Sequence, residues 1–426
     1  MSENNIKVNV VSKPFIVSAV IFVFAGSIIG ATWMMSLLGA EGVGIAHTSF
    51  SLHKTFQVDG FLTLLIMGIG YMIVPRFRNI QLSSSRWAYL SFLLIIFSIS
   101  VSVVSAFTNE SFLLLGSFAQ FLGVSIFCSI MIWTLRIHPR LLRTADYFIG
   151  LSVLVLLAIS LFDLIPGIID LIGGGRILQD ERSENGNVLS EAQMLLLFAI
   201  LMIFGIEYKT LPSFLGFIKP RKKMSIVSIC LGIASVILGL SSMIHKEILL
   251  AIIFNIVMLI FVLIFATSVY IFGGFDNREI LRIIQGERKA RYTYIIRHLR
   301  LAFIFLFAGI ILAAAFNISE GFVLYDLAIH YVAIGFIGIT IALYLPLMLP
   351  PITGRMVHFT NFNLLPLLFV VAALAIRTLG DSVMTTTLAS VSYFFMVSGW
   401  LIVAALFTFV TMIHRSMKHD EKINEQ

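Results

Sequence analysis

Twelve apolar runs, each about 20 residues long, fill most of this 426-residue chain. A run of that length crosses the hydrocarbon core of a bilayer as an α-helix, because a helix satisfies its own backbone hydrogen bonds where no water is present. Hydrophobic residues make up 59% of the chain and charged residues 12%, a balance that excludes a water-soluble domain. The sequence therefore predicts an all-α integral membrane bundle with spans at approximately 14–38, 49–75, 86–107, 111–135, 145–165, 189–208, 224–244, 248–273, 296–317, 323–350, 363–379 and 388–413.

The distribution of positive charge is an independent test of this count. With twelve spans, the two termini and the even-numbered loops share one side, and 24 of the 29 Lys and Arg residues fall on it. Cytoplasmic loops carry an excess of Lys and Arg, so we expect a multi-pass protein of the cell membrane with both termini in the cytoplasm. The net charge of +7 then reflects these loops and not nucleic-acid binding. The five cations on the outer side are Lys54, Arg176, Arg182, Lys246 and Arg377.

The remaining sequence offers little room for a soluble domain. We expect a polar N-terminal leader at 1–13, one transmembrane domain at 14–413 and a polar C-terminal tail at 414–426. The first span is expected to be retained, because it lacks a convincing cleavage site. The two cysteines, Cys128 and Cys230, lie inside spans, and no Cys-x-x-Cys-His motif occurs, which excludes covalent c-type haem and a disulfide framework.

Two histidines stand out by their depth in the membrane. His53 lies about four residues and His330 about seven residues from the outer end of spans two and ten, so at about 1.5 Å per residue their depths agree within about 5 Å. Gly60 and Gly338 follow at helical spacings that would leave room beside them. An intramembrane histidine is costly and usually functional. The pattern indicates either a shared metal or haem, or two histidines that are hydrogen-bonded separately.

Four further polar side chains belong to the same outer region. Asp59 is too deep to reach water and needs a partner or a proton. A functional role, as a proton path or a partner to a cofactor, and a structural role, as a buried ion pair or a hydrogen-bonded neutral acid, are equally compatible with it. Gln57 lies one turn from His53. The cations Lys54 and Arg377 could meet anionic groups of a cofactor, such as haem propionates, or extend to outer headgroups.

Other ionisable residues are expected at the membrane edges. Glu207 and Lys209 close span six and are interpreted as interfacial. The same interpretation applies to the histidines near the cytoplasmic edge, which are His138, His298, His358, His414 and His419. His47 and His245 fall in or beside outer loops, where water can solvate them.

Three segments carry a resemblance to known membrane proteins. Residues 52–60 and 70–76, with a His followed seven residues later by Gly and then by Tyr and Pro, resemble span two of haem–copper oxidase catalytic subunits. Residues 326–332 resemble their span ten, and twelve spans is also their number. Residues 204–217, together with the run from His330 to Gly338 and the sequence 353–355, look like the NnrS family of that superfamily, which is associated with haem, copper and nitric-oxide stress.

The departures from the oxidase pattern are equally informative. Ala328 stands where oxidases carry the histidine of the high-spin haem, and Ile352 stands where NnrS proteins carry a histidine. Spans six and seven contain no histidine to bind copper; His245 lies beyond the end of span seven. The resemblance thus implies one low-spin haem b, with His53 and His330 as axial ligands of its iron, and it makes copper and dioxygen reduction improbable.

The resemblance implies a haem protein with a role in electron transfer or in the nitric-oxide stress response. Electrons would come from quinol or from a respiratory partner subunit, since the chain has no soluble redox domain. Two alternatives remain open at this point: a haem-free transporter or channel with Asp59 on its polar path, and a haem-free assembly factor for respiratory complexes. Whether the protein is an enzyme is not decided by the sequence.

Overall fold

The computed structural model describes residues 10–36, 43–108, 112–137, 143–173, 185–214, 219–273, 284–319, 322–382 and 388–423. These residues form helices joined by turns, and no strand occurs among them. Eleven helices in these segments are long and apolar enough to cross a membrane. The prediction of an all-α, multi-pass architecture is confirmed at this level.

The eleven spans follow one another along the chain, and two of them contain several helical segments in series. They are α1 (Ser12–Ser36); α2, η1 and α3 (Val43–Thr55, Phe56–Thr63 and Leu64–Arg78); α4 (Ser85–Phe107); α5 (Leu113–Arg136); α6 (Thr144–Gly173); α7 (Asn185–Phe214); α8 (Lys222–His245); α9 (Ile248–Ser268); α11 (Gly286–Ser319); α12, η5 and α13 (Phe322–His330, Tyr331–Gly338 and Ile339–Met348); and α16 (Leu388–Ile423).

The twelfth expected span, 363–379, corresponds to a shorter helix. This helix is α15 (Leu365–Ser382), and its apolar part, Leu365–Gly380, is shorter than the other spans. It lies along α16, which continues as a helix through most of the expected polar tail to Ile423. The expected leader lies largely outside the described residues, as do Arg176 and Arg182.

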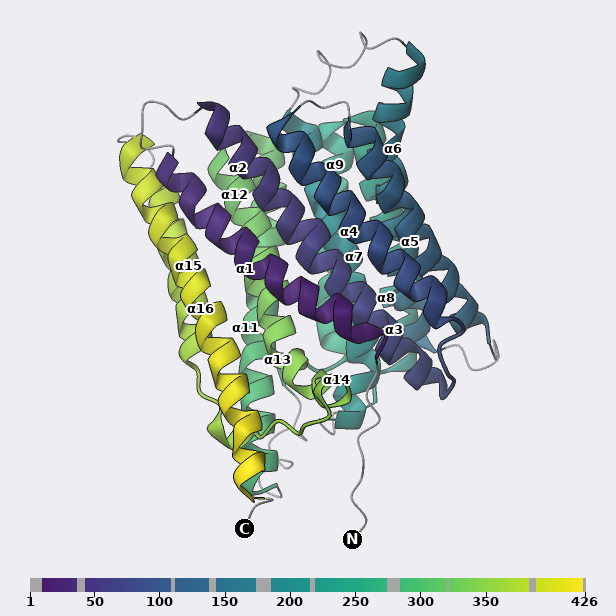
Figure 1. Ribbon diagram of the computed structural model, residues 1–426, viewed down its shortest axis with the longest axis vertical. Coiled ribbons are helices and arrows are strands. Elements are labelled where there is room, and N and C mark those ends of the chain that lie inside the picture. Colours follow the sequence, from purple (N-terminus) through teal and green to yellow (C-terminus); the bar gives the residue numbers. More distant parts are fainter. Residues whose placement is uncertain are drawn as a thin grey trace.

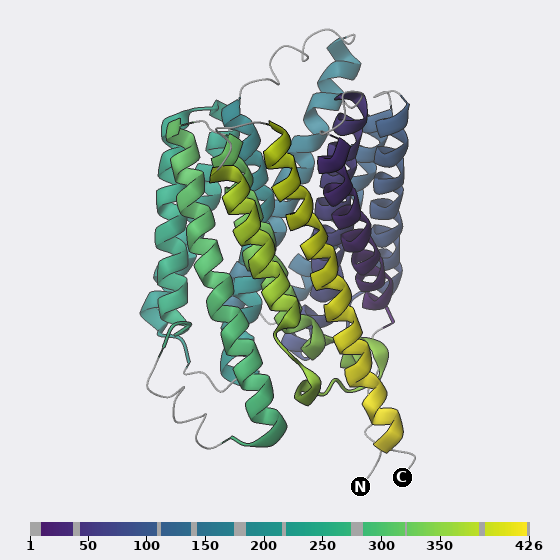
Figure 2. The ribbon, with the colours of Figure 1, turned by 90° about the vertical axis from the view of Figure 1, so that its left-hand side faces the viewer.

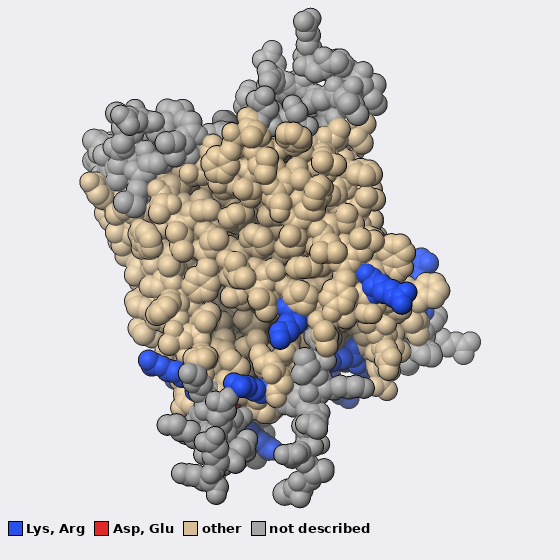
Figure 3. Space-filling model, in the orientation of Figure 1, with Lys and Arg blue, Asp and Glu red and all other residues tan. Residues whose placement is uncertain are grey.

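The helices form one upright bundle. In Figures 1 and 2, α1 begins and α16 ends at the same end of the bundle. On the face drawn in Figure 3, the Lys and Arg side chains lie on the half of the molecule toward that end, and the tan surface of the other half shows none. This separation is the arrangement expected of helices that cross a bilayer with their positive side in the cytoplasm.

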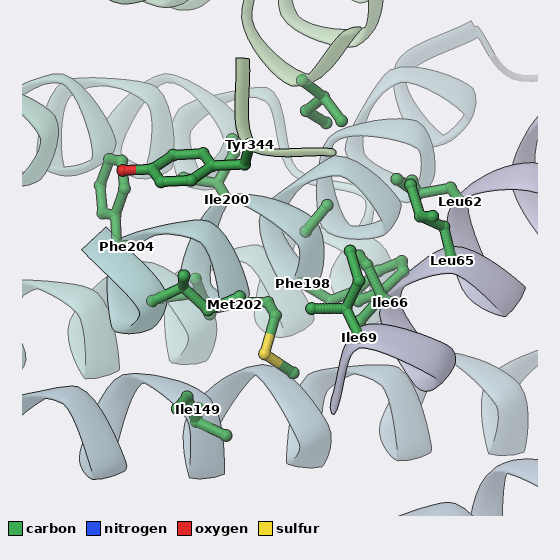
Figure 4. Close-up of a cluster of buried hydrophobic side chains, with 14 of the residues drawn as sticks. Leu62, Leu65, Ile66, Ile69, Ile149, Phe198, Ile200, Met202, Phe204 and Tyr344 are labelled. Atoms are coloured by element: carbon green, nitrogen blue, oxygen red, sulfur yellow. The ribbon is translucent and has the colours of Figure 1, made fainter. Parts of the chain in front are cut away.

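The core of the bundle is built around α7. In the membrane-length part of this helix 83% of the residues are buried, against 28% in α4 at the edge. Figure 4 shows Phe198, Met202 and Phe204 of α7 among side chains of the neighbouring helices, with Tyr344 of α13 beside Phe204. The Phe204 ring also stacks on Phe265 of α9 with ring centroids 3.5 Å apart. Aromatic and branched side chains thus fix the centre of the fold.

Both spans that carry the intramembrane histidines contain a π-helical segment. The segment η1 begins three residues after His53, and η5 begins immediately after His330. π-Helical turns are rare and often occur at functional sites, because a wider i→i+5 turn is less stable than an α-turn. The two spans therefore share the same irregularity within one turn after their histidines.

Candidate functional site

The backbone of α1 determines the orientation of the His53 ring. The Nδ1 atom lies 2.7 Å from the carbonyl oxygen of Gly26. A carbonyl oxygen only accepts hydrogen bonds, so Nδ1 carries the proton and donates it. Gly26 and Gly30 form a Gly-x-x-x-Gly pair on α1, and a β-carbon at Gly30 would come within 2.5 Å of the same nitrogen. Gly30 thus admits the imidazole against the helix, Gly26 supplies the acceptor oxygen, and the lone pair stays on Nε2.

His330 has the same arrangement within its own span. Its Nδ1 lies 2.8 Å from the backbone oxygen of Asp326, one turn earlier, and 3.2 Å from the Asp326 carboxylate oxygen Oδ1. Both oxygens accept, so Nδ1 is again the protonated nitrogen and Nε2 keeps its lone pair. Histidines that bind metals nearly always donate their other ring nitrogen to a carbonyl or a carboxylate in this manner.

The two imidazoles belong to one electrostatic neighbourhood. His53 lies close enough to His330, Arg377 and Asp326 to interact electrostatically with all three. In Figure 1, α2 and α12 lie toward the end of the bundle opposite the C-terminal end of α16. The two rings therefore lie within electrostatic range of each other.

A buried ion pair holds the carboxylate that His330 Nδ1 contacts. Arg377 of α15 binds both carboxylate oxygens of Asp326; its Nη2 lies 2.6 Å from Oδ1, and its Nε bonds Oδ2. The two side chains are 9% and 7% exposed, and the guanidinium carbon of Arg377 lies 4.7 Å from the centre of the Phe395 ring. A two-pronged pair of this kind is strong and directional. It fixes the carboxylate that His330 contacts.

The other expected members of the site have partners on neighbouring helices. Lys54 forms an exposed ion pair with Glu191 at 3.6 Å. The Gln57 amide donates to Ser27 Oγ at 3.1 Å and thereby ties η1 to α1. Neither contact lies at Nε2 of either histidine.

Asp59 accepts a hydrogen bond from Gln120 of α5 at 2.8 Å. The deep carboxylate therefore has the partner that its position requires, on the side of η1 that faces α5. The Asp59–Gln120 contact is separate from the contacts of the two histidines.

Rings of neighbouring helices fill the space beside two glycines of the histidine spans. A β-carbon at Gly60 would meet the Phe22 ring of α1 at 2.5 Å, and one at Gly335 would meet Phe305 of α11 at 2.6 Å. These two glycines admit rings of neighbouring helices. At Gly338 the nearest atom is the Ala333 oxygen, at 3.5 Å. Gly60 and His53 both face α1, as their spacing predicts, but the Phe22 ring takes the space beside Gly60 that was expected to be open.

Two expectations about the membrane edge are also wrong. Glu207 is fully buried, and neither of its carboxylate oxygens has a hydrogen-bond partner among the described residues. His298 is 2% exposed and donates from Nδ1 to the Tyr294 backbone oxygen at 2.8 Å. Both helices are deeply packed where a simple hydropathy count expects an interface. Lys209 lies near the edge, bonded to the Phe77 backbone oxygen at 2.8 Å.

Sequence reasoning assigned no role to three supporting features. Asp326 is one helical turn before His330, a spacing that places both on one face. The Gly-x-x-x-Gly pair at 26 and 30 signals a close helix–helix approach. Both signals were present in the sequence. The Gln120 contact with Asp59 carries no local signal, since it joins residues 61 positions apart.

Comparison with known proteins gives no functional assignment, so the geometry of the two histidines is its main basis. No profile of a known protein family matches the chain, and no curated protein matches it.

Proposed function

We propose that this chain is an NnrS-like membrane cytochrome that holds one haem b between His53 and His330. The observation that carries the proposal is the shared arrangement of the two rings: each donates Nδ1 to an oxygen acceptor and keeps the Nε2 lone pair for a ligand. This is the tautomer that binds a metal through Nε2, and the oxygen acceptor raises the basicity of the ligand.

The residues around the histidines fit such a group. His53 and His330 would be the axial ligands, with Gly26 and Asp326 fixing their tautomers. Arg377 acts through Asp326 as a positioning residue in this proposal, because two of its nitrogens are already bonded there. The π-helical segments beside both histidines are a further mark of functional spans.

Electron transfer is the role that this ligand set supports best. A haem with two imidazole ligands supplies a one-electron redox centre with no open coordination position. The chain's own residues would then orient the group and exclude water from it. Quinol or a respiratory partner subunit would supply the electrons. The nitric-oxide stress response, which the NnrS resemblance implies, is the second use of the same centre.

Gly30→Ala tests the positioning of His53 without removing a ligand. The new methyl group would overlap the imidazole, and overpacking of this kind costs about 1–3 kcal/mol. We expect haem content per chain to fall and the remaining haem band to change shape. The matched control is Gly150→Ala, whose β-carbon meets only Leu135, at 3.7 Å. A variant with unaltered haem content and spectrum would contradict the role of Gly30.

Asp59→Asn separates the cytochrome from a transporter. Asparagine keeps the size of the side chain and can still bond Gln120, so we expect unchanged haem content per chain. If the protein were a transporter with Asp59 as its proton site, the unaltered protein would already be colourless. The Asp59→Asn variant would then lose transport activity. Haem extraction from Asp59→Asn and from unaltered protein measures the difference. Loss of haem in Asp59→Asn would place Asp59 in the haem site and contradict this assignment.

A further inference from the structure

A cluster of cations lies where four helix ends meet at the basic end of the bundle. Arg78 ends α3 and donates from Nη2 to the Leu135 oxygen near the end of α5, at 2.9 Å. Its Nη2 also lies 3.2 Å from Asp146 at the start of α6. Lys209, near the end of α7, donates to the Phe77 oxygen of α3 at 2.8 Å. The site is therefore assembled from segments far apart in the sequence.

Positive charge exceeds negative charge in this cluster. Lys209 interacts electrostatically with Arg78, Arg143 and Asp146. Asp146 is the single carboxylate among these four side chains. It is already engaged with Arg78 and with the backbone N–H of Arg143, at 2.8 Å. Three cations thus share one anion in a site where the Arg78 side chain is only 4% exposed. An additional anion would relieve the repulsion among them.

The aromatic residues next to the cluster indicate its depth. Trp133 of α5 is 64% exposed and lies two residues before Leu135; Tyr147 of α6 is 52% exposed and follows Asp146. Tyr and Trp gather at the level of lipid headgroups, where one part of the ring is apolar and the other is wet. The cluster therefore lies at the depth of phosphate groups. In Figure 3, Lys and Arg lie on the half of the molecule toward this same end.

We propose that the cluster of Arg78, Arg143 and Lys209 binds the phosphate group of an anionic phospholipid from the cytoplasmic leaflet. Arg143 is exposed and can reach the headgroup, whereas Lys209 is half-buried and Arg78 is buried. Basic sites between helix ends on the cytoplasmic side are suited to such headgroups. The site is distinct from the histidine pair, and it does not depend on haem.

Lipid retention tests the proposal on the full chain. The unaltered protein and the variants Arg143→Gln and Lys209→Gln are purified from micelles that hold equal amounts of phosphatidylglycerol and phosphatidylcholine, and bound lipid is counted by native mass spectrometry. We expect the unaltered protein to retain phosphatidylglycerol preferentially. Each variant should lose about fivefold in retention, as expected for one cation near a phospholipid phosphate.

Lys223→Gln is the matched control, because Lys223 is an exposed cation at the start of α8 and its removal changes the net charge equally. It should keep the lipid. Equal loss in the control would mean general surface charge and would overturn the site, as would unchanged retention in Arg143→Gln. An excess of inorganic phosphate should leave the lipid bound. Displacement by inorganic phosphate would show a free-anion site and would overturn the assignment to phospholipid.

Discussion

Alanine at His53 or at His330 is expected to leave the purified protein without haem. Each ring supplies one of the two axial ligands in the proposed site through its Nε2. The Nδ1 atom of the remaining histidine is bonded to an oxygen, so it cannot replace the lost ligand. Haem content per chain should fall from one to near zero in either variant. Pyridine haemochrome assay of the purified variants measures this loss.

The control for the ligand variants is His414→Ala, which removes an exposed histidine of α16 far along the chain from both rings. It should keep the full haem content. Helical content by circular dichroism and elution from a size-exclusion column show whether the ligand variants are folded. Added imidazole should restore part of the haem band in a folded ligand variant, because the free ligand fills the vacated position. Full haem content in both alanine variants would contradict the proposed ligation.

Loss of Arg377 is expected to have the second largest effect. Arg377→Leu would leave the Asp326 carboxylate buried without its partner, and breaking a buried ion pair from one side costs about 3–5 kcal/mol. The free energy of unfolding in detergent should fall by this amount. The freed carboxylate would also hold His330 less firmly, so haem retention should fall with stability.

A second variant distinguishes the ion pair from simple loss of packing. The double variant Asp326→Asn with Arg377→Leu removes both charges, so it should recover a large part of the lost free energy of unfolding. Glu191→Gln breaks the exposed pair with Lys54 and should cost less than about 1 kcal/mol. If the double variant were as unstable as the sum of its two single variants, the buried charge would not be the cause.

The sequence was most informative about elements that depend on local composition. Long apolar runs predict helices because backbone groups in a bilayer must be satisfied internally, and eleven of the expected spans have counterparts among the described residues. The run at 363–379 is the exception in length; its helix packs along α16. The similar depth of His53 and His330 is a prediction from the same counting.

Features that depend on contacts between distant segments could not be predicted from the sequence. Glu207 is buried because α7 lies at the centre of the bundle. The sequence of α7 alone does not predict that central position. Arg377 was expected to meet anionic groups of a cofactor or to extend to outer headgroups, whereas it bonds Asp326 because α15 meets α12. The ring that fills the space beside Gly60 belongs to Phe22 of α1, so the spacing within span two alone could not predict it.

The measurement that tests the central proposal most directly is a reduced-minus-oxidised visible spectrum of the unaltered protein, with haem quantified per chain. The protein is purified in mild detergent from a host with ample haem. The proposal predicts a sharp low-spin b-type band at one haem per chain. A colourless protein from the same host would contradict it and would favour a transporter or an assembly factor.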